Sequence, residues 1–163
     1  MEASLYLIHP NDLETLILEA GNSQAVLESP FIQQSLYLGD TWDTVNRALN
    51  PEGQTAEHAL QYVIQAEHPL SERIDHPEAV RYNTVVRTAE IQQQLRSLSV
   101  DELKKRYQFD IVHTAPEALA QEIRLAELKL IYVQLQDLYR TAVRQNFAVL
   151  SVIQSKIRPE KLI

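Results

Sequence analysis

Two copies of an acid-His-Pro triplet lie close together in the sequence, at residues 67–69 and 75–77. An imidazole backed by a carboxylate is common at metal sites, because the acid holds the ring in one tautomer. His68 and His76 are therefore weak candidates for metal ligands. A closed metal site needs three or four ligands of defined geometry. We therefore favour a turn-forming role in a solvated loop, and expect no metal and no cofactor.

A second group of chemically useful residues surrounds Trp42, the single tryptophan of the chain. A tryptophan ring can stack on a ligand while neighbouring carboxylates bind a hydroxyl or an amine. The simpler interpretation is a helix that Asp40 caps and that turns Trp42 and Val45 toward the core. The polar neighbours of Trp42 in the sequence are Asp40, Asp43, Asn46 and Arg47.

The third group is Arg81, Tyr82 and Arg87, at a predicted junction between a strand and a helix. Backbone N–H groups at a helix start, together with a guanidinium, favour an anionic partner such as a carboxylate or a phosphate. The competing interpretation is that Arg81 pairs with one of the many acidic side chains of this chain. If the fold brings the second and third groups together, the candidate ligand-binding residues are Trp42, Asp43, Arg81 and Tyr82.

Composition excludes several classes of function. No Gly-rich phosphate loop, GxSxG elbow or HExxH helix occurs, and we assign no catalytic residue. The absence of cysteine excludes disulfides, zinc thiolate sites and cysteine nucleophiles. The formal net charge of -7 at pH 7 disfavours nucleic acid. The apolar runs are shorter than the roughly 20 residues of a membrane span, and the segment before His9-Pro10 is too short for a signal peptide. We expect a cytoplasmic protein.

The periodicity of apolar residues predicts the elements that must position these groups. Strands are predicted at residues 4–8, 80–83 and 147–153, and a surface loop at 67–78. Helices are predicted at 12–20, 29–39, 42–49, 56–66 and 84–98, with Thr84 as the cap of the last of these. A short surface helix is predicted to begin at Asp101 and to end near the basic residues 104–106.

The strongest signal is a long amphipathic helix at residues 116–145, about 45 Å long at 1.5 Å per residue. The almost wholly apolar segment 147–153 after it has the pattern of a strand buried on both faces. We therefore predict an α+β fold, a helix-rich single domain over residues 1–163. In it, a small sheet of the three predicted strands packs on the long C-terminal helix. The chain is expected to be a monomer, or a homodimer formed through that helix.

Several segments together resemble the YfbM-like family, a bacterial domain of unknown function. They are the LGDTWD helix start at residues 38–43, the Arg81-Tyr82 step with Thr84, and the helix from Asp101 to Tyr107. The long final helix with Leu138-Tyr139 and Ala142, and the strand containing residues 148–150, complete the resemblance. It covers most of the chain, implies an α+β fold and brings no reaction with it.

Two functions follow as hypotheses. The first is a non-enzymatic binding or interaction module that presents an acidic surface to a basic protein partner, because unlike charges speed encounter. The alternative is a small-molecule or anion-binding enzyme with a cleft near Trp42, Asp43, Arg81 and Tyr82. The alternative requires those side chains to lie close together in space.

Overall fold

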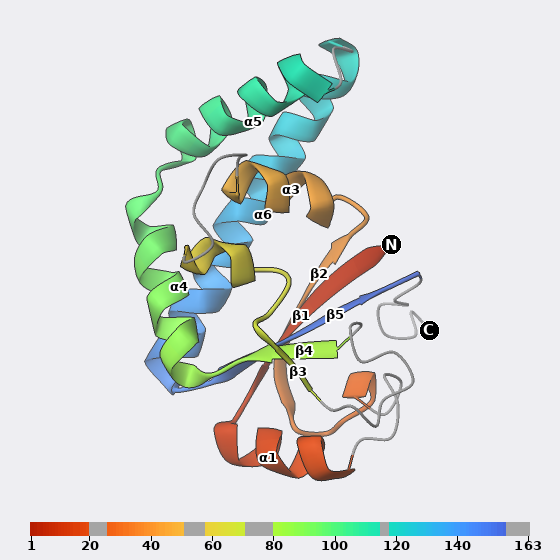
Figure 1. The fold of residues 1–163 in the computed structure, drawn as a ribbon, viewed down its shortest axis with the longest axis vertical. Coiled ribbons are helices and arrows are strands. Elements are labelled where there is room, and N and C mark those ends of the chain that lie inside the picture. The colour runs from red at the N-terminus through yellow and green to blue at the C-terminus, as the bar shows by residue number, and fades with distance from the viewer. Residues whose placement is uncertain (20–25, 51–57, 71–79, 115–117, 156–163) are drawn as a thin grey trace.

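The computed structural model describes residues 1–19, 26–50, 58–70, 80–114 and 118–155, with the backbone alone for 109–114 and 118–124 (Figure 1). The strands are β1 (Glu2–Ile8), β2 (Ile32–Gly39), β3 (His68–Pro69), β4 (Val80–Asn83) and β5 (Ala148–Gln154). The helices are α1 (Pro10–Glu19), α3 (Trp42–Leu49), the 3-10 helix η1 (Ala59–Tyr62), α4 (Val85–Ser97), α5 (Val100–Thr114) and α6 (Ala118–Gln145).

The described strands form one antiparallel sheet in the order β2-β1-β5-β4-β3. The predicted central position of the last strand is confirmed, because β5 pairs with β1 on one side and with β4 on the other. In this register Glu2 lies opposite Gln154, and Val80 lies opposite Val152. The start of β1, the end of β5 and the start of β4 therefore meet at one end of the sheet.

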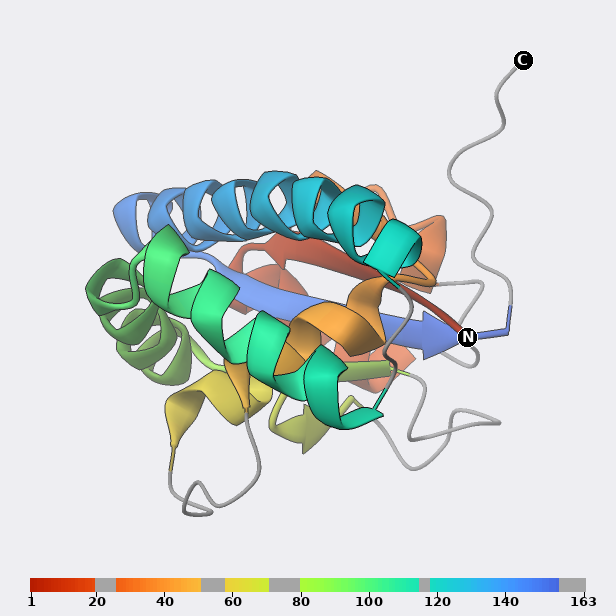
Figure 2. The ribbon, with the colours of Figure 1, turned by 90° about the horizontal axis from the view of Figure 1, so that it is seen from above.

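Both faces of the sheet are buried, which confirms the predicted α+β fold. Because successive strand residues point to opposite faces, Leu5 and Leu7 of β1 join a core cluster with α3, α4, α5 and α6. Tyr6 and Ile8 join a second cluster with Leu13 of α1 on the other face. The two views of the ribbon show this layering, with α6 running along one face of the sheet and α1 lying on the other (Figures 1 and 2).

The long helix and the strand after it form the centre of the molecule, as predicted. Leu135 and Tyr139 of α6 are fully buried, as is Val149 of β5. The chain reverses sharply between them because Asn146 adopts a left-handed backbone conformation with φ of 61°, which asparagine tolerates better than most residues. The Phe147 N–H then donates to the Ala142 carbonyl at 2.8 Å and closes the end of the helix.

The predicted helix at residues 29–39 is wrong, because residues 32–39 form strand β2. The separation of four between Ile32 and Leu36 fits one helical turn, but it equally fits two periods of a strand. Pairing decides between them, since Leu5 of β1 lies opposite Leu36 and Ile8 lies opposite Ile32. As an edge strand β2 exposes much of its length, so it lacks the apolar run by which strands are recognised.

Smaller differences concern the ends of elements. In place of the predicted helix at 56–66, the described part has only the short η1, and part of the predicted loop, His68–Pro69, forms strand β3. Helix α5 continues to Thr114, past the basic residues expected at its end. Thr41, rather than Asp40, is the cap residue of α3, and its hydroxyl donates to the Leu38 carbonyl at 2.9 Å. The predicted cap Thr84 is confirmed, because its Oγ1 accepts from the Arg87 N–H.

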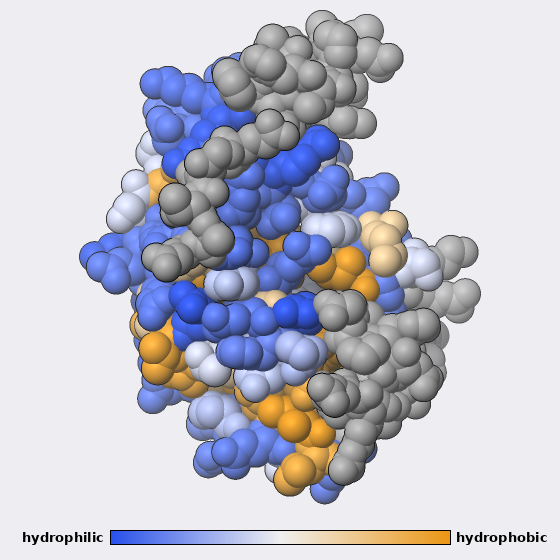
Figure 3. Space-filling view, viewed as in Figure 1, coloured by the Kyte–Doolittle hydropathy of each residue, from blue (hydrophilic) through white to orange (hydrophobic). Residues whose placement is uncertain are grey.

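Hydrophilic residues cover most of the described surface in the view of Figure 3, and hydrophobic residues show only in smaller areas. Within the described part of the chain, none of the helices combines the length and the apolar character that a membrane crossing requires.

Candidate ligand-binding site

A cavity of about 980 Å³ lies at the end of the sheet where β1 begins and β5 ends. Its size is that of a pocket for one small organic molecule, for which roughly 300 to 1,000 Å³ is usual. Helix α3 and the segment from η1 to β3 complete its walls. The residues that line it are Met1, Trp42, Asn46, Asn50, Gln61, Tyr62, Gln65, Ala66, Arg81, Ile153, Gln154 and Ser155.

Trp42 is the first residue of α3, and its side chain is only half-buried, with part of the ring packed on the core. Its indole Nε1 donates a hydrogen bond to the Met1 carbonyl at 3.1 Å. This bond ties the start of β1 to α3 and fixes the orientation of the ring. The remaining ring surface is available for stacking against a ligand in the cavity.

Arg81 of β4 lies in the same cavity, so the structure brings Trp42 and Arg81 together. Its guanidinium donates to the backbone carbonyls of Ala66 and Glu67, the second at 2.7 Å. Arg81 therefore holds the segment between η1 and β3 against the sheet. Both acceptors are main-chain oxygens, a role for Arg81 that the sequence did not suggest.

The other two predicted site residues lie outside the lining. Tyr82 follows Arg81 in a strand and therefore points to the opposite face, where it packs with the α1 cluster and lies 5.3 Å from the His68 ring, centroid to centroid. Asp43 is exposed on α3, about 100° around the helix axis from Trp42. The alternation of side chains in a strand therefore points Tyr82 away from Arg81, and the turn of the helix points Asp43 away from Trp42.

Amide side chains form much of the remaining wall. Asn50 donates from Nδ2 to the Asn46 carbonyl, to the Asn46 Oδ1 and to the Leu60 carbonyl, at 3.0 to 3.2 Å. This clip joins the end of α3 to η1, the two elements on either side of the cavity. Gln65 is exposed, so its amide is open to a ligand. An amide both donates and accepts, so it suits a ligand with hydroxyl or amide groups.

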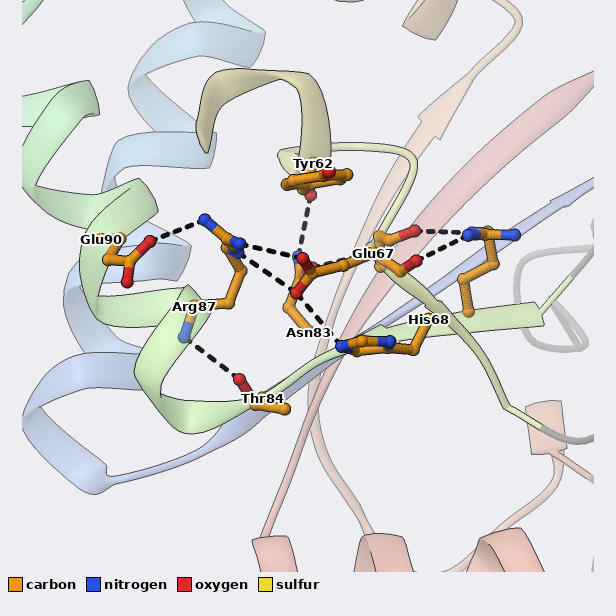
Figure 4. Close-up of polar contacts among 9 residues, drawn as sticks. Tyr62, Glu67, His68, Asn83, Thr84, Arg87 and Glu90 are labelled. Carbon is orange, nitrogen blue, oxygen red and sulfur yellow. Dashed lines mark hydrogen bonds and ion pairs between the residues drawn. The ribbon is translucent and has the colours of Figure 1, made fainter. Parts of the chain in front are cut away.

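A buried polar network supports this wall from behind (Figure 4). Asn83 is fully buried, and its Oδ1 accepts from the Glu67 N–H at 2.9 Å while its Nδ2 donates to the Tyr62 carbonyl at 2.8 Å. The Tyr139 hydroxyl of α6 donates to the Val63 carbonyl at 2.6 Å. Burial raises the pKa of Tyr139 far above its usual range, so this hydroxyl keeps its proton.

An ion-pair cluster stands beside the network (Figure 4). The Arg87 guanidinium binds both carboxylate oxygens of Glu67, at 3.2 and 2.9 Å, and its third nitrogen reaches Glu90 at 2.6 Å. It also lies 5.0 Å from the centroid of the Tyr62 ring, a cation–π distance. The hydrogen bonds from Arg87 hold the pKa of Glu67 below its usual range.

The candidate metal ligands are not brought into a site within the described residues. His68 is exposed, and its Nε2 lies 3.1 Å from Glu67 Oε1, a carboxylate that Arg87 already binds. His76 lies outside the described residues. Among the described residues no group of three or more acidic or histidine side chains is arranged to hold a metal ion.

Sequence reasoning missed Tyr62, Asn50, Gln61 and Gln65 as lining residues. They come from the end of α3 and from the segment around η1, which the sequence pattern assigned to a turn and a regular helix. Hydrogen bonds from Arg81 and Asn83 of β4 hold the main chain of that segment beside the cavity, and no local sequence signal reports such contacts.

The comparisons with known proteins agree with this fold. A family model described as "Domain of unknown function (DUF1877)" matches residues 1–152. Among solved structures, the crystal structure of a protein of unknown function, YfbM from Escherichia coli, matches with a TM-score of 0.69 and 18% sequence identity. The match covers 94% of this chain and 100% of that chain. None of the curated proteins matches the chain.

Proposed function

The chain belongs to the DUF1877 family of domains of unknown function. We propose that it is a ligand-binding protein whose site is the 980 Å³ cavity. The ligand class is an uncharged ring compound that carries hydroxyl or amide groups. The observation that carries the proposal is that aromatic rings and amide side chains from α3, η1 and β5 converge on one cavity of suitable size.

The character of the walls supports an uncharged ligand. Trp42 and Tyr62 offer rings for stacking, and the amides of Asn46 and Gln65 offer both donors and acceptors. Among the described residues of the lining, Arg81 is the one with a charged side chain, and its guanidinium donates to the main-chain carbonyls of Ala66 and Glu67. Binding energy would then come from stacking and neutral hydrogen bonds rather than from an ion pair.

Trp42 gives a direct measurement, because it is the single tryptophan of the chain. Glucose, N-acetylglucosamine and uridine, titrated separately to about 10 mM, cover the ligand range that the proposal names. We expect saturable change in Trp42 emission with at least one of them. Glucose 6-phosphate should bind no more tightly than glucose if Arg81 acts through main-chain carbonyls. An absence of saturation with all three compounds would refute the proposal.

Replacement of Gln65 by alanine removes an exposed amide from the wall. A neutral hydrogen bond contributes about 0.5 to 1.5 kcal/mol, so the affinity for the bound compound should fall roughly twofold to tenfold. Calorimetric titration measures this fall independently of fluorescence. Gln134→Ala is the matched control, since Gln134 is an exposed glutamine of α6 outside the cavity and should leave affinity unchanged. Equal affinities of the two variants would contradict the assignment of Gln65 to the site.

The interaction with a basic protein partner remains a second prediction, supported by the net charge of -7. It predicts an association rate that falls as salt rises, because exposed charges are screened beyond about 10 Å at 0.1 M ionic strength. The binding of a neutral ring compound in the cavity should not depend on salt concentration in this way. Measurements at several ionic strengths therefore distinguish the two hypotheses.

A further inference from the structure

Arg87 of α4 lies beside the first cavity, the one of about 980 Å³, without lining it. It does not line the smaller cavity of about 640 Å³ between η1, α4 and α5 either. Its guanidinium lies 5.0 Å from the centroid of the Tyr62 ring, and Tyr62 does line the first cavity. Arg87 therefore covers a part of the ring that is turned away from the cavity, and the rest of the ring remains for a ligand.

Two carboxylates fix the position of Arg87. Glu67 accepts hydrogen bonds from two of its guanidinium nitrogens at 3.2 and 2.9 Å, and Glu90 accepts from the third at 2.6 Å. The side chains of Arg87 and Glu67 are 25% and 22% exposed, so salt and water screen this pair less than a pair on the open surface. A guanidinium with all three nitrogens bound can hold an aromatic ring in one place.

Glu67 extends this support to the main chain of the same wall (Figure 4). Its N–H donates to Asn83 Oδ1 at 2.9 Å, and its carbonyl accepts from Arg81 at 2.7 Å. The Tyr62 carbonyl accepts from Asn83 Nδ2 at 2.8 Å. The main chain of Tyr62 is therefore held by β4, and its ring is held by Arg87 of α4.

The cation also changes what the Tyr62 ring attracts. The faces of an aromatic ring carry negative charge, and a guanidinium beside the ring attracts this charge. The partly positive C–H groups of a sugar are then attracted less strongly to the ring, whereas a flat aromatic ring still stacks on it. An amide such as that of Gln65 suits amide groups at the edge of the stacked ring. The wall therefore favours an aromatic heterocycle with amide groups, such as a nucleobase, over a sugar ring.

We propose that Arg87 is a positioning residue of the first cavity, which fixes the Tyr62 ring for stacking on a flat heterocyclic ring of the ligand. This inference rests on the proposed function. It narrows the ligand class from ring compounds in general to aromatic heterocycles that carry amide groups.

The ligand class is tested with uridine as the probe and with ribose as the analogue that lacks the base. The readout is Trp42 emission. We expect saturation with uridine, and binding of ribose that is weaker by about tenfold or more, because the stacked base is lost. Saturation with glucose or N-acetylglucosamine but not with uridine would overturn this inference and leave the proposed function standing. An absence of saturation with all three compounds would refute both.

A double-mutant cycle on uridine affinity tests the role of Arg87. Arg87→Met should weaken binding roughly threefold to tenfold in the parent background. It should have no further effect where Tyr62→Leu has already removed the ring. Arg87→Lys keeps a cation beside the ring and should restore part of the affinity. An equal loss from Arg87→Met in both backgrounds, or no loss in either, would overturn the positioning role.

Arg140→Met is the matched control, since Arg140 of α6 also forms an ion pair three residues along a helix, with Asp137 at 3.0 Å, and lies outside the cavity. It should leave uridine affinity unchanged. A second measurement needs no ligand: the ring proton resonances of Tyr62, assigned with Tyr62→Leu, should shift in Arg87→Met and not in Arg140→Met. If Arg87→Met does not fold, Arg87→Lys replaces it, with smaller changes of the same kind. Unchanged Tyr62 resonances and uridine affinity in the folded Arg87 variant would refute the proposal.

Discussion

Leu135→Ala is expected to lower the free energy of unfolding by about 2 to 5 kcal/mol, the range found for truncation of a buried leucine. Leu135 is fully buried in the middle of α6, in the cluster that fills the space between this helix and the sheet. Its removal leaves a void that the surrounding residues of two layers cannot easily close. Urea unfolding should show a lower midpoint with an unchanged m-value.

Leu130→Ala is the matched control on the same helix, because the Leu130 side chain is 61% exposed. An exposed substitution of this kind usually changes stability by less than about 0.5 kcal/mol. The difference between the two losses in free energy of unfolding reports the effect of burial, since the residue type and the helix are the same. Similar losses in both variants, or a loss in neither, would contradict the central position of α6.

The parts of the fold that the sequence predicted well are those whose burial leaves a long or continuous pattern. The apolar segment at β5 must be buried on both of its faces, and the apolar stripe of α6 repeats over many helical turns. Thr84 was predictable for a different reason, because capping depends on one side chain and the backbone beside it. The capping signal depends only on nearby residues, and the two apolar patterns are long. Contacts with distant parts of the chain therefore do not change the structures that these signals predict.

The error at β2 has a physical origin in its exposure. Gln33, Gln34 and Ser35 are exposed at the edge of the sheet, so little of the strand carries a hydrophobic pattern. Its conformation comes from hydrogen bonding to β1, a partner far away in the sequence. Single-sequence patterns contain no information on such a partner.

The candidate site was predictable in part. Trp42 and Arg81 do line one cavity, but Asp43 and Tyr82 do not. The sequence suggests Asp43 for its carboxylate beside Trp42, and Tyr82 for its place beside Arg81 at the predicted junction of strand and helix. The alternation of side chains in a strand would have excluded Tyr82 once residues 80–83 were predicted to be a strand.

Asn83→Ala is the second substitution with a large expected effect, a loss of about 2 to 4 kcal/mol in the free energy of unfolding. Asn83 is fully buried and does not line either cavity. Its truncation leaves the Glu67 N–H and the Tyr62 carbonyl without their side-chain partner. Each buried group left unpaired costs about 1 to 3 kcal/mol, less where solvent reaches it. Asn11→Ala, at an exposed asparagine of α1, should have a small effect on the same unfolding curve.

Asn83→Ala and Leu135→Ala should destabilise different parts of the molecule. Native-state hydrogen exchange should accelerate most at the Glu67 amide, which loses its acceptor. The adjacent Ala66 amide, which donates to the Ser151 hydroxyl at 3.1 Å, should be less affected. Because this segment forms one wall of the first cavity, Asn83→Ala should also weaken binding there without touching the ligand. A variant destabilised as expected that keeps full affinity for the cavity ligand would show that the network supports the fold alone.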